Sequence, residues 1–222
     1  MRIRLSERKL PDYTRGEELF NMISHIAGGA LAVTTLVLCV VKSVLAGRVA
    51  GIVSSAVYGG CMLLMYCMSS IYHGLRPSLG KKVLQVLDHC AIYFMIAGTY
   101  TPILLCAIRP IHPALAWAAF GGEWGLTALA VTLTAIDLKQ YRAFSMVCYI
   151  VMGWAVAAFL PETWAALTRP GFFLLLAGGI SYTVGAILFG IGARRRYFHG
   201  AFHVFVLLGS LLHFLAIYLF AL

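Results

Sequence analysis

Seven long apolar stretches, separated by short polar breaks, account for most of this 222-residue chain. The hydrocarbon core of a bilayer is about 30 Å thick, so a helix needs roughly 20 apolar residues to cross it. Backbone polar groups in lipid must bond within their own segment, which favours a helix for each stretch. The sequence therefore predicts an all-α integral membrane protein, a bundle of seven transmembrane helices at residues 20–42, 50–73, 84–107, 113–136, 143–161, 170–192 and 200–221.

The composition is typical of a membrane protein. Hydrophobic residues make up 61% of the chain and charged residues only 11%, whereas a soluble domain is about a quarter charged. The net charge of +9 would suit a nucleic-acid partner, but in a membrane protein the distribution of Lys and Arg matters more than their sum. We therefore expect no nucleic-acid binding. The six cysteines fall inside the apolar stretches without a repeated spacing, which indicates small buried residues and not a disulfide framework.

The basic residues are distributed unequally between the two ends of the predicted spans. If the amino terminus is cytoplasmic, 13 of the 17 basic residues fall on that side: Arg2, Arg4, Arg8, Lys9, Arg15, Arg76, Lys81, Lys82, Lys139, Arg142, Arg194, Arg195 and Arg196. The other side holds only four, Lys42, Arg48, Arg109 and Arg169. Positive charge collects on the cytoplasmic side, so we expect the amino terminus inside and the carboxyl terminus outside. The short connections predict one domain over residues 1–222, in which 1–18 form a short cytoplasmic segment.

Ionisable and hydroxyl side chains occur at the cytoplasmic ends of three predicted spans. The last span opens with His199 and His203, which lie four residues apart and so share a helix face. The second span ends with Ser69 and His73 at the same spacing, and the third begins with Asp88. Unpaired ionisable groups are costly in a membrane and indicate a functional site. Because the predicted topology places these side chains at one depth, we expect them to form one cluster.

Three neutral imidazoles are a common zinc ligand set that leaves a fourth position for water. In this interpretation His73, His199 and His203 bind Zn²⁺, Asp88 binds the water or orients a ligand, and Ser69 forms a hydrogen bond beside it. Zinc would lower the pKa of that water toward about 7 and make it a nucleophile. The same ligands would also suit a closed structural site that joins spans two, three and seven, and the sequence leaves both uses open.

A polar stripe on the first span lies near the same face of the membrane. Asn21, Ser24 and His25 fall on one side of that helix. One interpretation is an interfacial helix start with a satisfied histidine, and the other is a second shell around the predicted site. His213 lies 14 residues beyond His199, which is about 21 Å deeper along the helix, so it cannot share a metal with the cluster.

These motifs resemble the hemolysin III family of bacterial inner-membrane proteins, within the progestin and adipoQ receptor superfamily. The resemblance covers nearly the whole chain and rests on Glu18-x-x-Asn21-x-x-Ser24-His25, Ser69-x-x-x-His73, Asp88-His-Cys-Ala-Ile-Tyr-x-x-Ile-Ala-Gly-Thr-Tyr-Thr-Pro102 and His199-x-x-x-His203. It implies a multi-pass seven-helix protein of the bacterial inner membrane with a zinc on the intracellular side. The implied ligands are His73, His199 and His203, with Asp88 at the zinc-bound water.

Alkaline ceramidases are similar in this pattern and cleave lipid amides. The resemblance therefore implies a zinc-dependent hydrolase whose ceramide-like or other amide-lipid substrate enters from the bilayer, with Asp88 as general base and Ser69 assisting the oxyanion. The alternative is a non-enzymatic regulator of membrane lipid or energy homeostasis with a structural zinc. A pore or transporter would use Glu123 or His213, but the spans are too apolar for an evident aqueous channel. With only about 18 residues before the first span, we do not expect a peptide-hormone receptor.

Overall fold

The computed structural model describes residues 5–192 and 195–222, and every regular element in these ranges is helical. The elements are η1 (Leu5–Glu7), α1 (Arg15–Leu45), α2 (Val49–Gly74), α3 (Leu79–Pro102), η2 (Ile103–Ile108), α4 (Pro113–Ile136), α5 (Arg142–Gly153), η3 (Ala155–Phe159), α6 (Leu160–Gly192), α7 (Phe198–Ala216) and η4 (Ile217–Ala221). The expected all-α class is thus confirmed for the described ranges. Three residues of the charge count, Arg2, Arg4 and Arg194, lie outside them.

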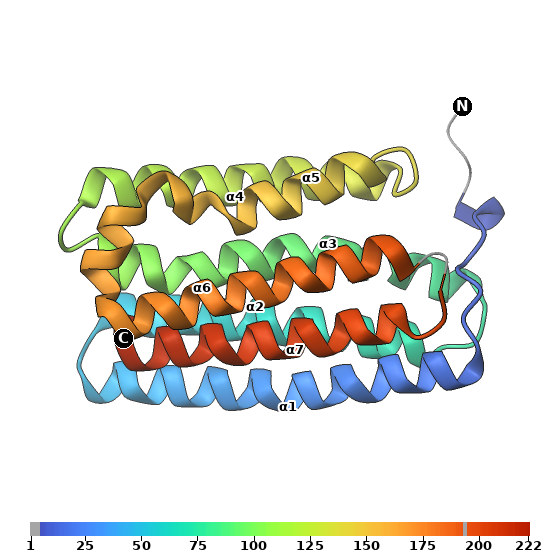
Figure 1. The fold of residues 1–222 in the computed structure, drawn as a ribbon, viewed down its shortest axis with the longest axis horizontal. Helices are drawn as coiled ribbons and strands as arrows, with labels where there is room; N and C mark the ends of the chain where they lie inside the picture. The colour runs from blue at the N-terminus through green and yellow to red at the C-terminus, as the bar shows by residue number, and fades with distance from the viewer. Residues whose placement is uncertain (1–4, 193–194) are drawn as a thin grey trace.

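Six helical segments of the described chain are long and apolar enough to cross a membrane. The fifth, Arg142–Gly190, contains 49 residues and includes α5, η3 and most of α6. A straight helix of that length would measure about 73 Å, more than twice the roughly 30 Å of a hydrocarbon core. The segment is not straight, because Thr168 has φ 58° and ψ 171°, and the chain reverses direction between α5 and the labelled part of α6 (Figure 1).

The polar break expected at residues 162–169 differs from the structure. This stretch belongs to α6, and Thr168 alone departs from helical dihedral angles there. Glu162 lies in the first turn of α6, where the helix dipole stabilises a carboxylate. Pro170 follows the kink, and its missing N–H prevents an unbroken helix. The polar residues at this position therefore belong to a kinked helix and do not form a loop.

Two helices begin before the apolar stretches that predict them. At the start of α1, Thr14 and Glu17 form a reciprocal capping box, which satisfies backbone N–H groups that the first helical turn leaves free. At the start of α3, the Ser78 hydroxyl accepts a hydrogen bond of 3.1 Å from the backbone of Lys81. Hydropathy does not detect such polar turns. They extend the helices beyond the apolar region and carry charged side chains toward the predicted site.

Helix α3 lies at the centre of the bundle. Helix α3 and η2 form one membrane-length segment. In the most apolar 18-residue window of this segment 72% of the residues are buried, against 22 to 44% in the corresponding windows of the other five segments. Helix α3 packs against α2 on one side and against α4 and α5 on the other, while α1 packs on α2 and α7, and α6 packs on α7. Figure 1 shows this arrangement, with the start of α1 and the carboxyl terminus at opposite ends of the bundle.

Close contact between α1 and α2 depends on Gly59. An added Cβ there would lie 2.7 Å from the backbone Cα of Leu36 and 2.6 Å from its Cβ, whereas a Cβ at the neighbouring Gly60 would meet nothing within 4 Å. Small residues permit such approach between membrane helices.

We expect Gly59→Ala to lower the free energy of unfolding by about 1–3 kcal/mol, because the two helices must move apart. Gly60→Ala is the matched control and should leave stability unchanged or slightly higher, since alanine favours a helix. Thermal unfolding of both purified variants in detergent would measure this. Equal melting temperatures for the two variants would contradict the close packing.

Candidate metal centre

The structure brings His73, His199 and His203 together at one end of the bundle. His73 lies in the last turn of α2, and the other two lie one turn apart at the start of α7. The Nε2 atom of His199 is 3.3 Å from Nε2 of His73 and 3.1 Å from Nε2 of His203. One ring nitrogen from each residue fits within a group whose members all lie within 4.8 Å of one another. Their predicted proximity is thus present in the structure.

The carboxylate of Glu18 orients the ring of His73. One Glu18 oxygen lies 2.6 Å from Nδ1 of His73, and the other accepts a bond of 2.6 Å from Nζ of Lys81. Lys81 is buried and also donates to the carbonyl of Leu75 at 2.9 Å. Because an ionised carboxylate only accepts hydrogen bonds, Nδ1 of His73 carries the proton. Its Nε2 lone pair then points toward the other two histidines.

The ring of His203 is held in the same way from α1. Its Nδ1 lies 3.2 Å from the backbone carbonyl of Asn21 and 3.2 Å from Oγ of Ser24. Since a carbonyl can only accept, Nδ1 of His203 is the donor. The Ser24 hydroxyl itself donates to the carbonyl of Asn21 at 2.9 Å. The Nε2 atom of His203 is thereby left as a lone pair within the cluster.

This nitrogen arrangement fits a tetrahedral metal ion. Zn–N bonds of about 2.0–2.1 Å place two ligand nitrogens of a tetrahedron about 3.3 Å apart, which matches the observed separations of 3.1 and 3.3 Å. A neutral His199 has at most one proton on Nε2, so it can donate to one neighbour only. Without a cation, the Nε2 lone pairs of at least two neighbouring histidines would therefore face each other. A bound metal would satisfy all three imidazoles.

The other residues of the predicted stripe on α1 also lie at this cluster. The buried ring of His25 stacks on His203 with 3.6 Å between centroids and 14° between planes. Within the described chain, neither ring nitrogen of His25 and neither side-chain amide atom of Asn21 has a hydrogen-bond partner. This contradicts the interpretation in which His25 is an interfacial histidine whose ring nitrogens are both hydrogen-bonded. His25 packs directly behind a candidate ligand.

Asp88 and Ser69 border the histidine cluster without belonging to the group of three ligand atoms. Both residues line a cavity that His199 and His203 also line. Ser69 is 1% exposed. The Oδ2 atom of Asp88 lies 3.7 Å from Nδ1 of His89, which donates at 2.8 Å to the carbonyl of Gln85. Asp88 thus faces the cavity as an acceptor beside the histidines.

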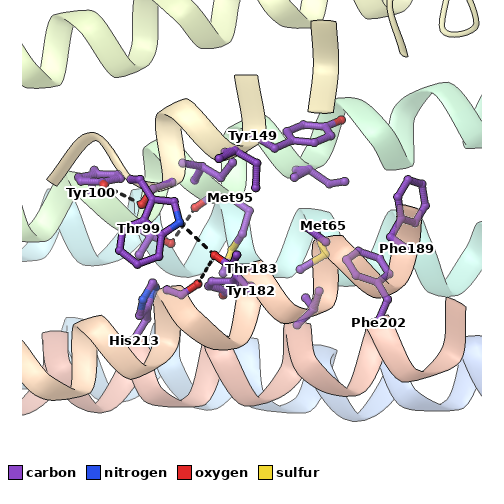
Figure 2. Close-up of a pocket in the computed structure, with 18 of the residues that line it drawn as sticks. Met65, Met95, Thr99, Tyr100, Tyr149, Tyr182, Thr183, Phe189, Phe202 and His213 are labelled. Carbon is purple, nitrogen blue, oxygen red and sulfur yellow. Dashed lines mark hydrogen bonds between the residues drawn. The ribbon is translucent and has the colours of Figure 1, made fainter. Parts of the chain in front are cut away.

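The cavity has a volume of about 210 Å³ and lies mainly between α3, α5, α6 and α7. Figure 2 shows the apolar side chains of Met65, Met95, Phe189 and Phe202 around it. His199 and His203 of the candidate site line one end, and His213 lines the cavity farther along α7. Glu123, which lies on α4, is buried at 6% exposure and does not line the cavity. The structure thus connects a polar cluster to an apolar chamber.

Sequence reasoning missed three residues of the site. Glu18 entered only as part of a motif, Lys81 was counted only among the basic residues of the predicted cytoplasmic side, and Tyr13 was overlooked. The ring of Tyr13 stacks on His199 at 5.0 Å with 20° between planes. Burial raises the pKa of Tyr13 above its ordinary value, and the carboxylates of Glu18 and Asp88 add to this effect. Glu18 lies three residues before Asn21, and this helical spacing could have placed it on the predicted stripe.

Comparison with known proteins agrees with the family resemblance seen in the sequence motifs. The Haemolysin-III related family matches residues 13–214 of the chain. The chain is 35% identical to Hemolysin-3 of Bacillus cereus over 201 residues, which is 90% of each protein. It is 35% identical to a Hemolysin-3 homolog of Bacillus subtilis (strain 168) over 198 residues, which is 89% of this chain and 91% of the relative.

A more distant likeness extends beyond bacteria. The protein named ADIPOR-like receptor IZH2 of Saccharomyces cerevisiae is 27% identical over 173 residues, which is 71% of this chain and 51% of the yeast protein. The family match and the six membrane-length helical segments indicate a multi-pass protein of the bacterial inner membrane. On this evidence, the chain belongs to the Haemolysin-III related family.

Proposed function

We propose that this protein is a zinc-dependent hydrolase of lipid amides that acts at the cytoplasmic side of the membrane. In this proposal the segment Arg142–Gly190 crosses the membrane twice, around the kink at Thr168. The protein then has seven spans, with the amino terminus inside and the carboxyl terminus outside. The distribution of basic residues supports this orientation, and it places the histidine cluster at the cytoplasmic face.

The donor set supports zinc as the metal. Three imidazole nitrogens with a carboxylate nearby suit a borderline metal such as zinc better than calcium or magnesium, which prefer oxygen ligands. The second nitrogen of His73 bonds a carboxylate, and that of His203 bonds a backbone carbonyl. Such outer contacts hold the ring orientation and tautomer of metal-binding histidines.

The observation that carries the enzymatic proposal is the cavity beside the cluster. Structural zinc sites usually have four protein ligands, whereas catalytic sites have three and an open position. Here three histidines converge, and the adjoining cavity is lined mainly by apolar side chains. An apolar chamber suits the hydrocarbon chain of a lipid. Asp88 and Ser69 lie at this same end of the chamber.

Each residue then has a distinct role in cleaving an amide such as that of a ceramide-like lipid. Bound zinc supplies a Lewis acid that polarises a carbonyl and acidifies water. Asp88 takes the proton of the attacking water and returns it to the leaving amine nitrogen. The Ser69 hydroxyl donates to the carbonyl oxygen as negative charge develops there. Asn21, Ser24 and His25 support the ring of His203 from behind.

The metal assignment predicts close to one zinc per chain in protein purified without chelators. His199→Ala removes one of three converging nitrogens and should abolish this zinc. His112→Ala is the control, because His112 precedes α4 and lies outside the ligand group. Elemental analysis of the wild type and both variants would measure the content. Wild-type protein without zinc would contradict the metal assignment.

The contact between Glu18 and His73 predicts that loss of the carboxylate weakens zinc binding without abolishing it. Glu18→Gln should weaken zinc affinity by about 10–100-fold, because the carboxylate that orients a ligand is lost. Glu162→Gln is the control, since Glu162 lies in the first turn of α6 and has no assigned role. Competition with a fluorescent zinc chelator would give both affinities. An unchanged affinity in Glu18→Gln would exclude this orienting role.

The assignment of Asp88 predicts loss of turnover with zinc retained. Asp88→Asn should lower kcat for an N-acyl lipid by about 10²–10⁴-fold, because an amide side chain cannot act as a base. Asp12→Asn is the matched control at an exposed position. Release of fatty acid from ceramide in detergent, measured beside zinc content, would test this. A zinc-loaded wild type that releases no fatty acid would instead favour the structural role of zinc.

A further inference from the structure

A glycine lies in the middle of the cavity wall that α6 forms. The residues three and four positions before Gly179, Leu176 and Leu175, line the cavity, and so do the residues three and four positions after it, Tyr182 and Thr183. Gly179 lines it as well. Positions three and four apart share one face of a helix, so a side chain at residue 179 would project into the cavity. An added Cβ there would meet nothing within 4 Å.

Helix packing accounts for other glycines of α6 but not for this one. At Gly178 an added Cβ would lie 2.1 Å from Cδ2 of His213 on α7. At Gly171 it would lie 2.8 Å from Cβ of Phe220 on η4. Small residues of this kind permit close approach between membrane helices. Gly179 has no such neighbour, and the space that its missing side chain leaves belongs to the cavity.

Gly179 lies well below the candidate metal centre. Phe189 lies toward one end of the cavity (Figure 2), and its ring is 5.6 Å from that of His199, so it marks the level of the site on α6. Gly179 precedes Phe189 by ten residues, which is about 15 Å along the helix. One leaflet, half of a hydrocarbon core of about 30 Å, has the same depth. An acyl chain of a membrane lipid, extended from the site, would therefore reach Gly179.

The cavity continues past Gly179 and stays apolar. Phe172 and Leu175 line this farther part. The polar side chains beside it already have partners, since Thr183 donates to the carbonyl of Gly179 at 2.8 Å and Trp154 donates to Thr183 at 3.0 Å. Apolar walls with paired polar groups suit a hydrocarbon chain without polar substituents.

We infer that Gly179 determines the length of acyl chain that the cavity accepts, because it keeps the cavity open at the depth of one leaflet. The inference rests on the proposed lipid function and narrows its substrate class to amides of long, unsubstituted fatty acids. A larger side chain at residue 179 would divide the cavity about 15 Å from the site. Long chains would then lose part of their binding site, whereas chains that end before residue 179 would keep theirs.

The test measures the binding of two fatty acids of different length, tritiated palmitic acid and octanoic acid, to purified protein in detergent. For each acid, the dissociation constant of a variant is divided by that of the wild type, so partition into detergent cancels. Octanoic acid is half as long as palmitic acid and should end before Gly179. We expect Gly179→Leu to raise the dissociation constant of palmitic acid about tenfold, as for overpacking a filled site, and to leave that of octanoic acid within about twofold.

Two other positions on α6 serve as comparisons. Ala186 lines the cavity seven residues closer to the site, so Ala186→Leu should weaken the binding of both acids. Gly190 is exposed and lies outside the cavity lining, and an added Cβ there would meet nothing within 4 Å. Gly190→Leu should therefore change neither affinity. Gly179→Met repeats the test with an unbranched side chain that fills irregular space, in case leucine disturbs folding.

The outcomes separate this inference from the proposed function. Unchanged palmitic acid binding in both Gly179→Leu and Gly179→Met would overturn the inference. So would an equal loss of the two acids in both variants, or a wild type that binds neither acid. If the length effect appears but the wild type neither binds zinc nor cleaves ceramide, the hydrolase proposal fails and the acyl-chain site remains. If the wild type cleaves ceramide and the length effect is absent, only the inference fails.

Discussion

The carboxylate of Glu18 is the contact on which the end of the bundle with the histidine cluster depends. It stands on α1 and bonds both His73 at the end of α2 and Lys81 at the start of α3. Removing one member of a buried ionic network is costly, because the remaining charge is left unpaired. The same carboxylate sets the tautomer of a candidate ligand. One side chain thus couples the packing of three helices to the geometry of the metal site.

The position of α5 explains how a chamber can exist inside so compact a bundle. Helix α5 packs against α3 and α4, while α6 packs against α7, and the cavity lies between these groups with lining residues from both α5 and α6. The kink at Thr168 lets one long helical segment contribute to opposite walls. A tightly packed interior would exclude a lipid chain. The structure therefore combines a closely packed half, formed by α1, α2 and α7, with a half that has room for a ligand.

The two ends of this chamber differ in the polar groups that lie there. At the candidate metal centre groups from α1, α2, α3 and α7 converge, and hydrogen bonds to Nδ1 of His73 and of His203 direct their Nε2 atoms toward Nε2 of His199. At His213 a single nitrogen lacks a partner while its neighbours have theirs. The first arrangement can bind a cation and act on a carbonyl, whereas the unpaired Nδ1 of His213 is closed off from the chamber.

The sequence alone determined the helical class, the approximate position of each apolar segment and the meeting of His73, His199 and His203, because hydropathy, charge and helical spacing are local properties. It also identified Asn21, Ser24 and His25 as one stripe. The tertiary structure alone decided that Glu18 faces His73, that Lys81 is buried, that Tyr13 covers His199 and that His213 bonds only one of its nitrogens. These contacts depend on how each helix is rotated about its axis and which neighbour it meets. Hydropathy marked a polar break at residues 162–169, but only the structure showed that it is a kink at Thr168 within a helical segment, where a residue with positive φ and a nearby proline bend the chain.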